Sequence, residues 1–331
     1  MSQVPTGETI ERAVRLAGRA PSLHNSQPWH WVFDGTVLRL HSDRTRLLPS
    51  TDTSGRQLLI SCGVALGHLR AALAAAGWRA QVAYFPNPTQ RDHLATVRFL
   101  PAHIVTDADR DRAAAIERRR TDRLPFETPV GWQDFETVLR TVVDPDDAVL
   151  TVLPDTARAA LAHASLITAS LRRYDAAYQA ELQWWAGHSH AAEGIPASAL
   201  ISREERERVS VGRTLPTVSG DSRRTEVADD RSSILVLSTT ADTPEELVRC
   251  GEALSTVLLE CTAAGYATCP LTNMTELPHG RAIVRDLVGG RVVPQVLVRA
   301  GTRPDTAPPP AATPRRPLPD ILEIIEPEQL R

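Results

Sequence analysis

Two short motifs carry the polar side chains best suited to hold a small molecule. Residues Pro21 to Trp29 (Pro-Ser-Leu-His-Asn-Ser-Gln-Pro-Trp) follow a helical stretch and offer a hydroxyl and an amide that can read the polar edge of a heterocycle. Residues Arg118 to Arg123 (Arg-Arg-Arg-Thr-Asp-Arg) put guanidinium donors beside a hydroxyl, a combination that suits a phosphate. Each motif also has a plainer explanation. The first can be an ordinary helix-to-strand turn, and the second can be a solvated basic helix end.

Patterns for other kinds of chemistry are weak or missing from the sequence. The chain has no Gly-x-Ser-x-Gly nucleophile elbow, no phosphate-binding P-loop and no Gly-x-Gly-x-x-Gly dinucleotide motif. His188 and His190 stand in a polar stretch without a carboxylate cluster, so we expect no metal site. The four cysteines form no Cys-x-x-Cys pair, and we expect buried free thiols.

The composition gives no general reason to expect a nucleic-acid or membrane partner. A length of 331 residues favours two domains or one large fold, and 42% hydrophobic residues can form its core. The net charge is −3, no apolar run approaches the roughly 20 residues that span a bilayer, and the N-terminus does not read as a secretory signal. We therefore expect a cytoplasmic protein. All 37 Lys and Arg positions are arginine, so guanidinium groups must meet any charge on a bound anion.

An internal repeat relates two apolar helical segments. Cys-Gly-Val-Ala-Leu at 62–66 recurs as Cys-Gly-Glu-Ala-Leu at 250–254, and Ala-Ala-Gly-Trp at 75–78 recurs as Ala-Ala-Gly-Tyr at 263–266, both 188 residues later. Apolar residues at three- and four-residue steps predict a helix in each segment, with Gly77 at the left-handed cap of the first. Chance matching of two alanine-rich helices is the alternative, but the shared register at both ends favours duplication.

The expected elements mix helices, strands and a hairpin turning at Asp34-Gly35, which argues for an α+β fold. Helices are expected over the two repeat segments and at 8–20, 107–120, 132–143 and 155–185. Strands are expected at 29–33, 37–41, 81–85, 93–100, 148–153, 233–239, 267–271 and 293–300. The stretch 187–230 lacks periodicity, which is typical of a functional or disordered insert. The proline-rich stretch 302–319 predicts an extended arm.

The two motifs together resemble the flavin-binding signature of the nitroreductase family. Residues 251–272 resemble that family's central helix and following strand, and residues 313–318 resemble its C-terminal basic element. In the family, the arginine motif comes first and each cofactor is shared between two subunits of a dimer. The reversed order here implies that one chain has absorbed both subunits, and the chain looks most like the Acg-type subgroup, whose members have a fused double nitroreductase fold.

The resemblance implies a nitroreductase-like fold duplicated in one chain, a pseudo-dimer with an inserted lid. Residues 1–105 would form a first, degenerate repeat and residues 106–331 a second, with the lid at about 187–230 and the arm at about 302–331. The first copy lacks the arginine motif and the second lacks Pro-Ser-x-x-Asn, so one FMN per chain is expected. Because the fused copies already bury the family's dimer surface, we expect a monomer.

The family pattern also implies which residues hold the FMN. Arg119 and Thr121 would hold the phosphate and ribityl end, Arg316 would reach back to the phosphate, and Arg123 would lie by the pyrimidine edge. The ring would lie among Pro21, Ser22, Asn25, Pro270, Leu271 and Thr272. The first three of these would pack on the ring and hydrogen-bond its carbonyl edge. The last three would run along the opposite edge, with a backbone N–H near flavin N5.

The function implied by the resemblance is an FMN-dependent oxidoreductase. Flavin N5 would take a hydride from NAD(P)H, and the electrons would pass to a small acceptor that the sequence does not identify. This chemistry needs no catalytic side chain, because the cofactor carries it and the protein supplies placement and polarity. The alternative is a protein that stores FMN under a closed lid, and a third reading is a folded remnant that binds nothing.

Overall fold

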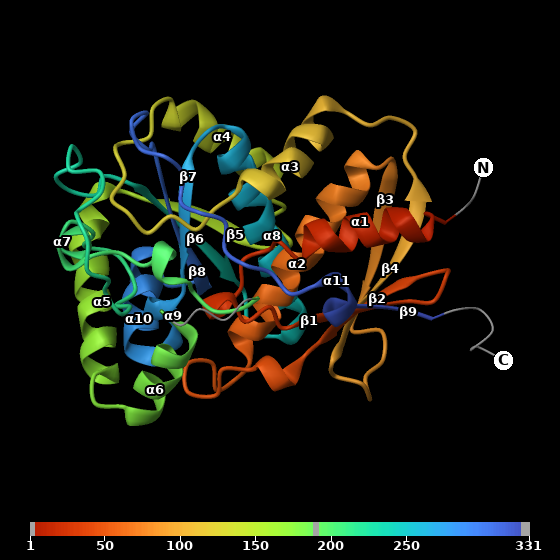
Figure 1. The fold of residues 1–331 in the computed structure, drawn as a ribbon, viewed down its shortest axis with the longest axis horizontal. Coiled ribbons are helices and arrows are strands. Elements are labelled where there is room, and N and C mark those ends of the chain that lie inside the picture. Colours follow the sequence, from red (N-terminus) through yellow and green to blue (C-terminus); the bar gives the residue numbers. More distant parts are fainter. Residues whose placement is uncertain (1–3, 188–191, 326–331) are drawn as a thin grey trace.

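Two antiparallel-rich sheets flank a pair of long helices in the computed structural model, which describes residues 4–187 and 192–325 (Figure 1). The helices are α2 (Arg56–Ala75) and α8 (Pro244–Ala263), the two repeat segments of the sequence. Among the described residues, only α2 has the length and apolar composition of a membrane span, and most of it is buried inside the protein. The α+β class expected from the sequence is confirmed.

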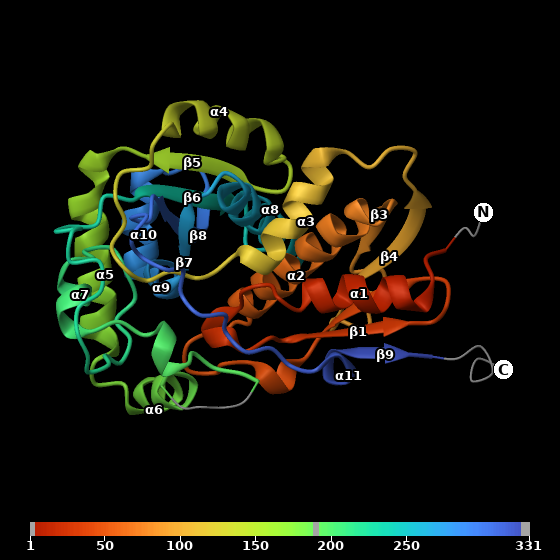
Figure 2. The same ribbon diagram turned by 45° about the horizontal axis from the view of Figure 1, so that its top comes forward.

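The first sheet has the strand order β3-β4-β2-β1-β9. Its strands are β1 (Trp29–Phe33), β2 (Leu38–Ser42), β3 (Trp78–Tyr84), β4 (His93–Pro101) and β9 (Leu322–Ile324). The expected hairpin joins β1 to β2, and Gly35 supplies the positive φ of +83° that its turn requires. The C-terminal arm contains β9, which the sequence did not predict, and this strand pairs in parallel with β1 (Figure 2).

The second sheet has the strand order β5-β6-β8-β7, with every pair antiparallel. Its strands are β5 (Val149–Leu153), β6 (Ser233–Thr239), β7 (Ala267–Leu271) and β8 (Val293–Gly301). Their burial is nearly continuous in β6 and β8, because α8 packs on one face and α5 (Arg158–Arg172) and α10 (Pro278–Leu287) pack on the other. The end of β7, together with Val296 and Arg299 of β8, is the part of this sheet that reaches the candidate site.

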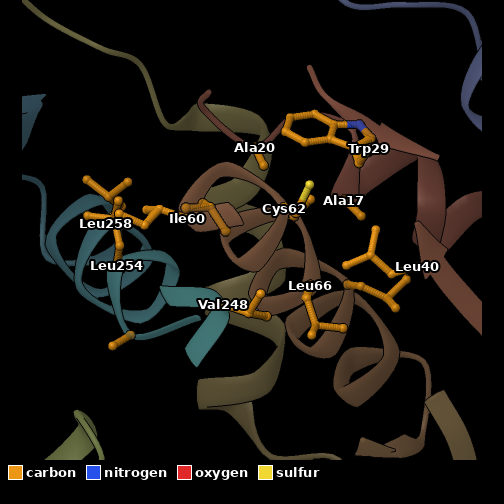
Figure 3. Close-up of a cluster of buried hydrophobic side chains, with 14 of the residues drawn as sticks. Ala17, Ala20, Trp29, Leu40, Ile60, Cys62, Leu66, Val248, Leu254 and Leu258 are labelled. Atoms are coloured by element: carbon orange, nitrogen blue, oxygen red, sulfur yellow. The ribbon is translucent and has the colours of Figure 1, made fainter. Parts of the chain in front are cut away.

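The crossing of α2 and α8 forms the centre of the molecule (Figure 3). Gly63 and Gly251 face each other there, and a Cβ on either would collide with the partner helix's backbone, at Val248 O and Ile60 O respectively. These glycines hold equivalent positions in the repeat. They let the backbones approach closely enough for Ile60 to pack beside Leu254 and Leu258 in the main core.

The remaining helices differ from the sequence expectations mainly after β5. They are α1 (Gly7–Ala17), α3 (Asp107–Arg118), α4 (Trp132–Val142), α5 (Arg158–Arg172), α6 (Ala176–Trp185), α7 (Arg203–Glu207), α9 (Asn273–Glu276), α10 (Pro278–Leu287) and α11 (Leu318–Ile321). The prediction of one helix over 155–185 was wrong. Asp175 begins a new helix, because its side chain accepts a hydrogen bond from Tyr178 N and caps α6.

The insert has its own small core in the part that the structure describes. Ile195, Leu200 and Leu215 of the insert pack with Tyr178 and Leu182 of α6. Apart from α7 and a single turn at 197–199, the residues 192–230 are irregular. The insert and α6 therefore form one packed unit beside α5 (Figure 2). The histidine pair at 188 and 190 lies outside the described residues.

All four cysteines are buried and unpaired, as the sequence predicts. Among the described residues, no group of three or more His, Cys, Asp or Glu side chains gathers in a metal-binding arrangement. Burial raises the pKa of each thiol, so the cysteines are protonated, packed side chains.

Candidate functional site

A cavity of about 430 Å³ lies where the first motif, the second motif and the end of β7 converge. Seven of the ten residues predicted to hold a cofactor line it: Pro21, Ser22, Thr121, Arg123, Pro270, Leu271 and Thr272. The other three, Arg119, Asn25 and Arg316, do not line it. Its walls are mostly apolar and come also from α2, α5 and the insert, which is the usual character of a small-molecule site.

Backbone pairing brings the second motif to β7. Asp122 N donates to Thr268 O at 2.9 Å, and Thr121 forms an isolated parallel bridge with Thr268. The chain after α3 is therefore extended, so that Thr121 and Arg123 both face the cavity beside Pro270. The two segments are some 150 residues apart in sequence, and they meet because the backbone at the edge of β7 hydrogen-bonds to the second motif.

The first motif has a strained backbone. His24, Asn25 and Gln27 have φ values of 50°, 61° and 52°, in the left-handed region that non-glycine residues seldom adopt. The surrounding structure holds this conformation: Ser22 Oγ accepts from Gln27 N at 2.8 Å, and Leu23 N donates to Ser61 Oγ of α2 at 3.3 Å. Strain of this kind clusters at ligand sites, and here it turns the His24 ring toward the cavity.

His24 is a neutral, buried imidazole without a hydrogen-bond partner. Neither ring nitrogen has a partner in the described part of the chain, and the residue is 5% exposed. Burial, followed by the positive charges of Arg213 and Arg123, lowers the pKa of His24 well below its usual value. A cavity ligand is therefore the available partner for one N–H donor and one nitrogen acceptor.

Four arginines gather beyond the Pro21 and Thr121 end of the cavity. Arg19, Arg119, Arg120 and Arg315 each have a buried guanidinium nitrogen without a hydrogen-bond partner, and none of the four forms an ion pair within the described residues. Burial and the charges of Arg120 and Arg19 lower the pKa of Arg119 to about 9. Burial and the same neighbours, with Arg119, lower the pKa of Arg315 to about 9. Buried positive charge without a carboxylate is costly, and an anion at this place would relieve it.

The sequence analysis expected Arg316 to reach the phosphate of FMN; in the structure Arg315, and not Arg316, lies in the arginine cluster. Arg315 Nη2 donates to Arg19 O at 2.9 Å, within the arginine cluster. Arg316 turns the other way, with Nη1 3.6 Å from Asp43 Oδ2 and 3.3 Å from Gln27 O. The two residues are adjacent in an extended arm, where successive side chains point to opposite sides, so tertiary contacts select which one reaches the cluster.

Asn25 is used to join segments and does not face the cavity. Its Nδ2 donates to Gly194 O of the insert at 3.0 Å and to Pro314 O of the arm at 3.1 Å. Its Oδ1 accepts from Arg315 Nη1 at 2.9 Å. Both amide donors of this side chain and its carbonyl oxygen therefore tie the first motif to the insert and the arm.

The insert closes one side of the cavity. It contributes ten lining residues: Ile195, Ile201, Arg206, Glu207, Val209, Ser210, Gly212, Arg213, Thr214 and Leu215. Arg213 forms an ion pair with Glu276, and its Nη2 donates to Thr272 Oγ1 at 3.1 Å. Arg224 pairs with Asp122 where both side chains are almost fully buried. The insert is therefore fastened to the floor of the site by buried charge pairs.

Sequence reasoning did not single out Arg19, Arg315 or Arg213 as site residues. The first two adjoin recognised motifs, but nothing in the sequence distinguishes Arg315 from the neighbouring Arg316. No local signal marked Arg213, because its partners Thr272 and Glu276 are 59 and 63 residues away.

Comparison with known proteins finds close relatives. The chain is 50% identical over 319 residues to a Mycobacterium tuberculosis H37Rv protein named "Putative NAD(P)H nitroreductase acg", and the match covers 96% of each chain. It is 51% identical over 319 residues to the uncharacterized protein Rv3127 of the same organism, covering 95% of this chain and 93% of the relative. No protein-family model matches the chain.

Solved structures resemble the chain more distantly. The FMN-dependent nitroreductase NfnB of Mycobacterium smegmatis in complex with NADPH is 16% identical, with a TM-score of 0.41 over 65% of this chain and 97% of that one. This likeness is too low to carry an argument, so kinship rests on the sequence relatives. Identity of one residue in two along nearly the full length of both chains reflects common descent, and the chain therefore belongs to the nitroreductase family as a close homologue of Acg.

Proposed function

We propose that the protein is an FMN-binding oxidoreductase that holds one FMN per chain in the described cavity. The observation that carries the proposal is the cluster of Arg19, Arg119, Arg120 and Arg315, whose buried guanidinium nitrogens lack partners beside a largely apolar cavity. An aromatic ring with a phosphate at the end of a flexible chain matches that pairing of apolar walls and uncompensated positive charge.

The residues present fit the two ends of FMN. The arginine cluster would hold the phosphate, and Thr121, which follows it directly in the chain, would meet the ribityl hydroxyls. Pro21, Pro270 and Leu271 would pack against the ring, with Arg123 at its pyrimidine edge. Arg123 is partly buried without a carboxylate partner in the described residues, and the hydrogen bond of its Nη1 goes to Ala199 O at 3.2 Å. Its positive charge would favour the electron-rich, reduced ring.

We propose further that the chain is a duplication in which the second flavin site has been lost. The contact of Gly63 with Gly251, at equivalent positions of the repeat, supports a pseudo-two-fold relation between α2 and α8. Val64 lines the cavity, and its equivalent in α8 is Glu252. Glu252 is buried and accepts hydrogen bonds from Arg70 at 2.9 Å and from Tyr84 OH at 2.5 Å. Charged side chains thus fill the place where a second ring would pack.

When bound, FMN supplies two-electron transfer between a nicotinamide donor and an acceptor. The chain's own contribution is to place the ring, to present Arg123 and a neutral His24 to it, and to exclude water with the insert. Relatives named NAD(P)H nitroreductases support NADH or NADPH as the donor.

A specific observation favours the second candidate function, storage of FMN without turnover. The pairs Arg213–Glu276 and Arg224–Asp122 fasten the insert over the site, and breaking a buried pair leaves an uncompensated charge. A closed insert would keep a nicotinamide from stacking on the ring. The two functions therefore differ in whether the insert opens, since both use the same FMN site.

Anaerobic reduction separates the two functions. The purified protein is expected to carry flavin absorbance, and rapid bleaching by NADPH or NADH supports the oxidoreductase. Flavin that resists both nucleotides, but becomes reducible in the double variant Arg213→Gln/Glu276→Gln, supports storage under the insert. Protein that is colourless and takes up no FMN on reconstitution contradicts both functions.

A further inference from the structure

A second cavity, of about 280 Å³, lies behind the first between α5, α6 and the insert. It shares Ser165, Arg213, Thr214 and Leu215 with the larger cavity. The two chambers are therefore neighbours separated by insert side chains. None of the residues predicted from the sequence lines the second chamber, and the proposed FMN site does not use it.

Buried polar atoms without partners line this chamber. Ser165 Oγ, Thr168 Oγ1 and Asn273 Oδ1 have no hydrogen-bond partner in the described part of the chain, and the residues are 7%, 4% and 4% exposed. Buried polar groups are normally satisfied, and an unsatisfied one is costly. The three residues lie in α5 and at the start of α9, and all of them line this chamber, which is large enough to hold a molecule.

The charges at this chamber are already paired. Arg172 Nη1 lies 3.1 Å from Asp175 Oδ2, and Arg213 pairs with Glu276. No Asp or Glu is among the residues that line the chamber. A charged ligand would meet no free countercharge and would still lose its hydration, so the site favours a neutral one.

The shape and the donor set define the ligand class. Leu182, Leu215 and Pro216 give the chamber an apolar wall. The other lining residues supply hydrogen-bonding groups. The hydroxyls of Ser165 and Thr168 can donate or accept, and Asn273 Oδ1 can accept. Arg172 Nε is a further buried donor without a partner. An apolar cavity of about 150 Å³ accommodates benzene, so 280 Å³ accommodates a ring with a polar substituent.

We propose that this chamber is a binding subsite for a neutral, ring-sized molecule that carries both a hydrogen-bond donor and an acceptor. The subsite does not require FMN, so its test is independent of the proposed function. A ligand here lies against Arg213, the residue that fastens the insert to Glu276. A molecule bound in the second chamber would therefore lie next to the Arg213–Glu276 ion pair, which fastens the insert over the larger cavity.

Three probes of one shape test the charge and the hydrogen bonding. Benzamide is neutral with a donor and an acceptor, benzoate is anionic, and benzylamine is cationic at neutral pH. Titration of the full-length protein without added FMN, followed by calorimetry or saturation-transfer NMR, is expected to detect benzamide binding and markedly weaker binding of both charged probes. Equal affinity for the three probes, or no binding of benzamide, overturns the proposal.

The variant Thr168→Val tests whether benzamide binds in the second chamber, because Thr168 lines this chamber and does not line the larger cavity. Replacing the hydroxyl by a methyl is expected to weaken benzamide binding by about tenfold, since a good ligand hydrogen bond is lost. Thr168→Ser keeps the hydroxyl and is expected to keep the affinity. The exposed Thr141→Val serves as the matched control, with affinity unchanged.

A stability measurement without probe distinguishes a ligand-binding hydroxyl from a structural one. Removing an unsatisfied buried hydroxyl is expected to leave the melting temperature of Thr168→Val unchanged or raised. A clear fall in melting temperature would mean that the hydroxyl stabilises the fold, and it would overturn the assignment. Benzamide binding that Thr168→Val leaves intact would place the probe elsewhere, with the same consequence.

Discussion

Arg315 Nη1 donates a hydrogen bond of 2.9 Å to Asn25 Oδ1 and so joins the C-terminal arm to the first motif across 290 residues. The same guanidinium also donates to Arg19 O. Arg315 is therefore held in the arginine cluster by neutral acceptors, while no carboxylate among the described residues offsets its charge. A side chain arranged in this way is prepared for an anion.

Replacing Arg315 is expected to weaken FMN binding selectively at the phosphate end. For Arg315→Gln, the dissociation constant for FMN should rise by about ten- to a hundredfold, because a charge-assisted hydrogen bond contributes roughly 1.5 to 3 kcal/mol. Quenching of flavin fluorescence measures this. Arg316→Gln is the matched control and should bind FMN as the parent does. An equal loss in both variants, or an equal loss for riboflavin, which lacks the phosphate, would contradict the assignment.

His24 is expected to matter through hydrogen bonding and not through charge. His24→Leu should weaken FMN binding by about tenfold while raising the melting temperature of the FMN-free protein, since both ring nitrogens are buried without partners there. His24→Gln retains a donor and an acceptor and should bind more tightly than His24→Leu. Because the pKa of His24 is far below 6.5, no His24-dependent change in affinity is expected between pH 6 and 8. Identical affinities in the two variants would refute the role.

Acid is expected to destabilise the protein through His41. Burial, together with the charges of His93, His30 and Arg39, lowers the pKa of His41 to about 4, although Asp92 opposes the shift. The folded state therefore binds fewer protons than the unfolded state between pH 6.5 and 4. The stability that the protein has with His41 neutral is thus fully present above pH 6.5 and is lost as the pH falls.

After allowance for solvent screening of the half-buried His41 ring, the free energy of unfolding should fall by about 1 kcal/mol on acidification. Urea unfolding at pH 7 and pH 4.5 measures it, and His41→Gln should reduce the difference. The matched variant His103→Gln, at an exposed residue outside this group, should leave the difference as it is. A pH dependence that His41→Gln does not change would show that other groups cause it.

The crossing of α2 and α8 should not tolerate a methyl group. Gly63→Ala is expected to lower the free energy of unfolding by about 3 kcal/mol or more, because the new Cβ would collide with the carbonyl oxygen of Val248. Gly7→Ala, at the exposed start of α1 with no atom near its added Cβ, should be neutral or slightly stabilising. Chemical denaturation compares the two, and similar small effects would argue against close helix contact.

The duplication that we propose for this chain leads us to expect a monomer. If the two copies already bury the surface that two subunits of the family bury between them, no further self-association is expected. Light scattering at micromolar concentration should give a mass near 36 kDa, the mass of one chain. A stable dimer mass would contradict the pseudo-dimer interpretation.

Local patterns in the sequence determined much of the framework. The β1–β2 hairpin follows from Asp34-Gly35, and the two repeat helices follow from apolar periodicity that ends at Gly77 and Gly265, both with positive φ. These features depend on neighbours within a few residues, so the sequence specifies them directly. Seven of the ten site residues that the family resemblance implied meet at one cavity.

Tertiary structure alone decided which side chains complete the site. The choice of Arg315 over Arg316, the pairing of Arg213 with Glu276 and the second chamber at Thr168 all depend on contacts between residues far apart in the chain. The break of the expected helix at Asp175 likewise accompanies the packing of α6 on the insert. A sequence shows which groups can bind charge or donate hydrogen bonds; only the packed chain determines which of them remain buried without a partner.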